Sequence, residues 1–176
     1  MRHLVNLLAV AALTLALPAC SGNDTSAPDD ETVLEEVTPA AGTPDADPEG
    51  SITVRLSGPM GSGMEQYVDL HQGGIDGPIV PMSCEPSDDR TTLTCTPGQP
   101  LQPGAPYTIH IGGGMMDDSD RPVEIEDHGM GMGGQLVTGE MMGGMHGGQP
   151  AGMMGPGWEH PADGHLGMIF TFETSD

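Results

Sequence analysis

Apolar and polar residues alternate along short stretches of the second half of this chain, with proline and glycine between them. Ile52, Val54 and Leu56 alternate with polar neighbours, a period of two that is typical of a half-buried strand. The same pattern predicts strands over residues 67–71, 78–84, 91–96, 106–111 and 168–173, with a brief one over 135–138. Turn dipeptides such as Pro97-Gly98 separate these stretches. Short alternating strands with frequent turns predict an all-β fold, a single β-sandwich.

The N-terminus has the pattern of an export signal. Arg2 precedes an apolar run over residues 7–17, which is shorter than the roughly 20 residues that span a bilayer and fits a signal peptide. The run ends in LPAC, which resembles the bacterial lipobox. Residues 1–19 are therefore predicted to be a lipoprotein signal peptide, with Cys20 lipidated and anchored in the membrane. An ordinary signal peptide with an incidental cysteine is the alternative. Gly22, in place of aspartate, favours the outer membrane, facing the periplasm or the cell surface.

Residues 20–50 are acidic and rich in proline, alanine and threonine, with few large apolar side chains. Such a segment buries too little surface to offset its ordering entropy. The sequence therefore predicts a disordered acidic tether over 20–50 and a folded domain over 51–176.

Charge narrows the possible partners. The chain has 26 acidic and 4 basic residues, so its surface repels nucleic acid and anionic lipid and attracts cations. We expect no nucleic-acid partner, and membrane contact only through the lipid anchor. The acidic balance is also typical of proteins from salty habitats.

Two cysteines remain once Cys20 is assigned to lipid. In an oxidising compartment, Cys84 and Cys95 are expected to form a disulfide between neighbouring strands. The alternative is that the two thiols bind a metal.

Four stretches resemble, in order, the SbsA-type bacterial Ig-like domain: ITVRLSGPMGSGM, TTLTCTPGQPLQPGAPYTIHI, DDSDRPV and FTFET. The resemblance covers about residues 51–123 and 165–174. It implies an Ig-like β-sandwich in the cell envelope, with the Tyr107 ring inside it and the Tyr107 hydroxyl bonded to nearby backbone. Leu56 replaces an aromatic residue of the family, and Arg121-Pro122 stands where a glycine-containing turn is usual. The family implies no enzymatic activity.

A long insertion, residues 124–164, separates the aspartate-containing turn from the last strand. Loops of this length tend to be functional or disordered. The insertion is rich in methionine, histidine and glycine, and thioether sulfur is a soft ligand that selects Cu(I) and, by the same logic, Ag(I). Glycine lets neighbouring ligands curl around one ion. The predicted metal ligands are His128, Met130, Met132, Met141, Met142, Met145, His146, Met153, Met154 and His160.

Other interpretations of these residues remain open. The segment can be a low-complexity loop without ligands, its methionines can fill gaps in the packing, or they can act as a reversible sink for oxidants. His71 and His110, on predicted strands, are expected to be structural or solvent-facing. The acidic stretch 117–127 lacks the spacing of a calcium-binding loop and is interpreted as a turn with a solvated face.

No catalytic motif is present, so the chain is not expected to be an enzyme. The sequence predicts a lipid-anchored envelope protein whose Met/His-rich loop binds Cu(I), for buffering or for handover to a metal-donor or metal-acceptor envelope protein. The alternative is an Ig-like spacer or protein-interaction module on the cell surface.

Overall fold

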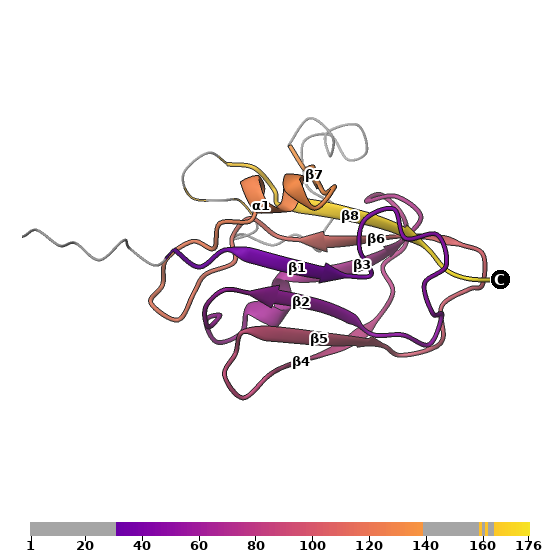
Figure 1. Ribbon diagram of the computed structural model, residues 1–176, viewed down its shortest axis with the longest axis horizontal. Coiled ribbons are helices and arrows are strands. Elements are labelled where there is room, and N and C mark those ends of the chain that lie inside the picture. Colours follow the sequence, from indigo (N-terminus) through magenta and orange to yellow (C-terminus); the bar gives the residue numbers. More distant parts are fainter. Residues whose placement is uncertain (1–30, 139–158, 160, 162–163) are drawn as a thin grey trace, which may run out of the picture.

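Two antiparallel sheets stack to form the domain in a computed structural model of the protein (Figure 1). The structure describes residues 31–138, 159, 161 and 164–176. In chain order the elements are β1 (Leu34–Thr38), β2 (Ile52–Leu56), the 3-10 helix η1 (Met64–Tyr67), β3 (Val68–Gln72), β4 (Met82–Pro86), β5 (Thr92–Pro97), β6 (Pro106–Ile111), α1 (Glu126–Gly131), β7 (Gln135–Leu136) and β8 (Met168–Glu173). No helix in these residues is long and apolar enough to cross a membrane.

The strand orders are β1-β2-β5-β4 in one sheet and β3-β6-β8-β7 in the other. All named pairs of strands are antiparallel. Because side chains alternate between the faces of a strand, each sheet presents one apolar face to the other, and these two faces form the core. The all-β sandwich predicted from the alternation is therefore confirmed.

Tyr107, on β6, occupies the predicted position in the core. Its side chain is buried, and its ring stacks on Phe172 with 5.8 Å between the centroids. The backbone N–H of Gln102 donates a hydrogen bond of 2.8 Å to the Tyr107 hydroxyl. The bond satisfies the one polar atom of a buried aromatic side chain, and it confirms the corner that the family resemblance implied.

The predicted boundary between a disordered tether (20–50) and the domain (51–176) is wrong, because residues 31–50 belong to the sandwich. β1 pairs with β2, and Leu34 and Val37 are buried in the core. A β-bulge places two exposed glutamates between these apolar residues. The bulge breaks the period of two, so the sequence pattern did not indicate a strand.

The loop predicted over 124–164 is also wrong in its first part. Ile125 is buried, α1 follows it, and β7 pairs with β8, which confirms the brief strand. A Cβ on Gly129 would lie 3.0 Å from the end of the Met168 side chain, so a larger residue here would force that methionine to shift. Glycine disfavours helices by propensity alone, and packing against the core overrides that preference here.

The acidic turn after β6 is organised around the buried Asp117 carboxylate. One of its oxygens accepts the backbone N–H groups of Ser119 and Arg121, each at 2.9 Å, and the other accepts the Arg121 guanidinium at 2.8 Å. Burial alone would raise the pKa of this carboxyl, but these donors outweigh burial and lower it. Asp120 takes the left-handed conformation (φ 59°) at the turn where the family often has glycine. Both oxygens are engaged in holding the turn, as the structural interpretation of this stretch predicts.

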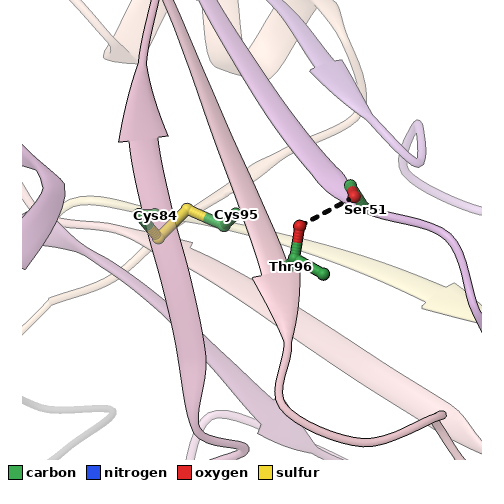
Figure 2. The surroundings of a disulfide bond; sticks show 4 residues. All are labelled: Ser51, Cys84, Cys95 and Thr96. Atoms are coloured by element: carbon green, nitrogen blue, oxygen red, sulfur yellow. Dashed lines mark hydrogen bonds between the residues drawn. A yellow bond between two sulfur atoms is a disulfide. The ribbon is translucent and has the colours of Figure 1, made fainter.

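The Cys84–Cys95 disulfide joins β4 to β5 at directly paired positions (Figure 2). The predicted pairing is confirmed, and the alternative of two metal-binding thiols is excluded. Beside it, the Ser51 and Thr96 hydroxyls share a hydrogen bond of 3.1 Å. Among the described strands, β4 pairs with β5 alone, so the disulfide ties this edge strand to the core.

Candidate functional site

One face of α1 borders a shallow depression beside β1. His128 and Met132 are four residues apart, so their side chains lie on the same side of the helical turn, and the Met132 N–H bonds to the His128 carbonyl at 3.1 Å. The depression has a volume of about 400 Å³. Its lining residues are Val33, Leu34, Glu35, Arg55, His128 and Met132. An imidazole and a thioether therefore share one solvent-accessible hollow.

Glu124 holds the His128 imidazole in place. Its carboxylate oxygen lies 2.6 Å from His128 Nδ1, so this nitrogen carries a proton and donates it, and in the neutral ring the lone pair is on Nε2. Burial alone would raise the pKa of Glu124, but the hydrogen bonds from His128 and from the Asp127 backbone outweigh burial and lower it. A carboxylate that orients a histidine through its second nitrogen is a common arrangement at metal-binding histidines.

The charges around the depression are mainly negative. Arg55 pairs with both Glu35 and Glu36, and Glu124 adds a further carboxylate. Three carboxylates against one guanidinium leave a local excess of negative charge, which favours a cation over an anion in this hollow.

The structure brings together two of the predicted ligands and separates a third. Met130 lies between His128 and Met132 in sequence but is 47% exposed and does not line the depression, because residues two apart on a helix do not face each other. Other predicted residues lie outside the described part of the chain: Met141, Met142, Met145, His146, Met153, Met154, His160 and the predicted lipidation site Cys20. Within the described residues, no group of three or more His, Cys, Asp or Glu side chains is arranged to hold a metal ion.

Several methionines of the domain have a packing role instead. Met60, Met115 and Met168 are buried in the core, and the Met64 sulfur lies 3.2 Å from the Met116 backbone nitrogen, which donates to it. For the three core residues, methionine fills gaps in the packing, and their sulfur atoms are not available to an ion from solvent.

The residues on either side of the Met/His-rich segment 139–163 are bonded to each other. The Val137 N–H bonds to the Gly167 carbonyl, and the Leu166 N–H bonds to the Val137 carbonyl, each at 2.8 Å. Val137, Leu166 and Ile169 form a small second apolar cluster. Because Ile169 pairs with His110 of β6, this cluster lies on the outer face of the β3-β6-β8-β7 sheet.

Two histidines lie on the same outer face. His71 is 5% exposed and His110 is 0% exposed, so the solvent-facing alternative is wrong for both. His71 Nδ1 lies 3.1 Å from the Gly77 carbonyl oxygen, and His110 Nε2 lies 2.8 Å from the Leu166 carbonyl oxygen. Their ring centroids are 6.4 Å apart. Both lie at outward positions of alternating strands, and the segments that cover this face make those positions interior: residues 73–77 cover His71, and the distant residues 164–167 cover His110.

Burial shifts the pKa values of His110 and Asp69 on this outer face. Burial lowers the pKa of His110 to about 4, further lowered by His71 and partly opposed by the hydrogen bond to Leu166. His110 is therefore neutral at neutral pH. Asp69 is directly opposite His110 in the strand register, and burial raises the pKa of its carboxyl while the nearby His71 lowers it.

Solved structures of other proteins are similar to parts of this chain at low sequence identity. The S-layer protein SbsC aligns with 53% of this chain and 12% of its own length, at 20% identity and a TM-score of 0.39. The copper resistance protein PcoC from Escherichia coli aligns with 81% of this chain and 98% of its own length, at 15% identity and 0.44. CopC from Methylosinus trichosporium OB3b aligns with 55% and 97%, at 15% identity and 0.40. These TM-scores are below 0.5, so the likenesses carry no argument about function.

No curated protein sequence matches the chain. A family model described as a bacterial Ig-like domain matches residues 24–126, which is more than half of the chain. The match includes β1, in agreement with the position of that strand in the sandwich, and it ends at the start of α1. The chain therefore belongs to the bacterial Ig-like domain family.

Proposed function

We propose that this protein is a non-catalytic, lipid-anchored Ig-like module of the cell envelope that binds Cu(I) as cargo, for buffering or for handover to another envelope protein. The observation that carries the proposal is the shared depression, in which an oriented imidazole and a thioether lie side by side under a local excess of negative charge.

The donor set suits a soft monovalent ion. Thioether sulfur is soft and neutral, and imidazole nitrogen also binds copper. His128 is oriented for coordination, because Glu124 holds Nδ1 and leaves Nε2 as the ligand atom. Methionine needs no deprotonation to bind and forms no disulfides, so a thioether site keeps working in an oxidising compartment. Ag(I) shares this chemistry and serves as a redox-inert probe.

A histidine and a single methionine do not complete a site that holds Cu(I) tightly. The remaining ligands in this proposal come from the predicted set outside the described residues: Met141, Met142, Met145, His146, Met153, Met154 and His160. The residues that flank their segment are bonded to the same sheet that α1 packs against. Anchoring through Cys20 would hold the whole assembly at the membrane.

A competition titration tests the proposal. The soluble protein, beginning after Cys20, is titrated with Cu(I) against a chromogenic Cu(I) chelator, beside a His128→Gln/Met132→Leu double variant. We expect the double variant to bind Cu(I) at least ten times more weakly. Met130→Leu is the matched control, because Met130 lies on the same helix but outside the depression, and it should bind like the parent. Equal affinity for the parent and the double variant would contradict a role of the depression.

A second variant tests the rest of the ligand set. Changing Met141, Met142, Met145, Met153 and Met154 to leucine preserves side-chain size and removes every thioether of this segment. We expect a further loss of Cu(I) affinity and unchanged circular dichroism. If neither this variant nor the double variant changes Cu(I) uptake, the protein is an Ig-like spacer or interaction module and the copper proposal fails.

A further inference from the structure

The outer face of the β3-β6-β8-β7 sheet carries a buried imidazole nitrogen that needs a partner. His71 Nδ1 donates to the Gly77 carbonyl oxygen, so in the neutral ring the lone pair is on Nε2. That nitrogen is buried and has no hydrogen-bond partner among the described residues. A buried polar atom without a partner is costly, so this nitrogen is available to accept a hydrogen bond or to bind an ion.

The neighbouring imidazole completes a pair. The His110 ring centroid is 6.4 Å from that of His71, and the ring planes are inclined by 52°. His110 Nε2 is bonded to the Leu166 carbonyl, so Nδ1 is the nitrogen through which His110 would coordinate an ion. An ion lying nearly in line between the rings would make two metal–nitrogen bonds of about 2 Å each. These two bonds, plus the distance from each ring nitrogen to its own ring centroid, add up to the separation between the centroids.

We propose that His71 and His110 form a buried two-coordinate site for one monovalent coinage-metal ion, Cu(I) or Ag(I), with His71 Nε2 as one ligand. Near-linear coordination by two imidazoles is a geometry that these ions accept. Zinc sites in proteins are almost always four-coordinate, and no third His, Cys, Asp or Glu joins the pair among the described residues. A pair of imidazoles therefore suits a monovalent coinage-metal ion better than zinc.

The charge of such an ion is balanced locally. Burying a cation without a counter-charge is unfavourable, and Asp69 is directly opposite His110 in the register of β3 and β6. Asp69 and His71 are two residues apart on β3, so their side chains lie on the same face. The carboxylate offsets one positive charge, which fits a monovalent ion better than a divalent one.

The site is covered by two short segments whose local opening would admit an ion. Residues 73–77 supply the Gly77 carbonyl that holds His71, and Gly73 has a positive φ of 80°. Residues 164–167 supply the Leu166 carbonyl that holds His110. Neither segment contributes to the depression beside α1, so this second site is separate from the proposed Cu(I) site and does not depend on it.

The test uses the full soluble chain and Ag(I). Nitrogen-15 NMR of the imidazoles follows silver nitrate titration in chloride-free buffer. We expect the His71 Nε2 resonance to shift as one equivalent binds, and a His71→Asn variant to take up one equivalent fewer than the parent. Asparagine retains a donor near the Nδ1 position but lacks Nε2. Unchanged His71 resonances at silver saturation, together with an unchanged stoichiometry in the variant, would overturn the inference.

The two sites are distinguished by the His128→Gln/Met132→Leu double variant. If it loses silver binding at the depression while the His71 resonance still shifts, both inferences stand. A shift of the His71 resonance with no contribution from the depression supports the buried pair and contradicts the proposed function. Silver binding at the depression without any shift of the His71 resonance supports the proposed function and contradicts the buried pair. Because the NMR measurement is made on the parent protein, the result does not depend on a variant that folds poorly.

Discussion

Acidification should destabilise the metal-free protein through His110. In the folded state, burial lowers the pKa of this imidazole from 6.5 to about 4. In the unfolded chain its pKa is 6.5, so it becomes protonated as the pH falls through that value. The unfolded state therefore binds more protons between these two values, and stability falls as the pH falls through this window. Above pH 6.5 the contribution of the neutral ring is fully present.

The magnitude follows from the size of the shift. A pKa difference of one unit corresponds to about 1.4 kcal/mol, so the shift of His110 removes about 3 kcal/mol from the free energy of unfolding by pH 4. Domains of this kind are stable by roughly 5–15 kcal/mol, so the loss is a large fraction of the total. Asp69, with its raised pKa, works in the opposite direction, and the experiment must separate the two groups.

A His110→Gln variant provides that separation. Glutamine retains a donor for the Leu166 carbonyl but does not titrate, whereas Asp69 and all other carboxyls are shared by both proteins. Urea unfolding in the presence of a chelator, followed by circular dichroism between pH 6.5 and pH 4, gives the free energy of unfolding of each. We expect the difference between parent and variant to decrease by about 3 kcal/mol across this range. Parallel curves would refute the assignment of a buried, neutral His110.

Three further predictions concern the fold. Leu34→Ala should lower the free energy of unfolding by about 2–5 kcal/mol, as a cavity in the core does, and a change within 0.5 kcal/mol, typical of exposed sites, would contradict the place of β1 in the sandwich. Removing the disulfide by Cys84→Ser/Cys95→Ser should lower the free energy of unfolding by about 2–4 kcal/mol, measured by urea unfolding. The same comparison is made on the parent with and without reductant. Asp117→Asn should cost about 1–3 kcal/mol, and a thermal midpoint equal to that of the parent would show that the turn does not need the carboxylate.

Strands with regular alternation, such as β2, were predictable from sequence because one side lies against the core and the other side toward solvent. Ile52, Val54 and Leu56 face one core and their neighbours face solvent, so hydrophobic period and burial coincide. Tyr107 was placed correctly because the residues before and after it form a recognisable local pattern. β1 escaped prediction since the bulge next to Leu34 interrupts the period, and a single displaced residue removes most of the signal.

The candidate site was only partly predictable for a different reason. The residue types indicated soft-metal chemistry, but the pairing of His128 with Met132 and the exclusion of Met130 depend on α1, a helix that glycine-rich sequence disfavours. His71 is covered by residues 73–77 just after its own strand, and His110 by residues 164–167, far away in sequence. No local pattern records which loop will cover which face of a sheet.

The paired backbone hydrogen bonds between Val137 and residues 166–167 have a consequence for how this domain tolerates change. They join the residues on either side of residues 139–163, so this pairing of the backbone does not depend on the sequence that lies between. The entropy of closing a chain grows slowly with its length, by about 0.6 kcal/mol for each doubling. Segments of other lengths and other ligand residues can therefore be inserted at this position with little loss of stability of the β-sandwich.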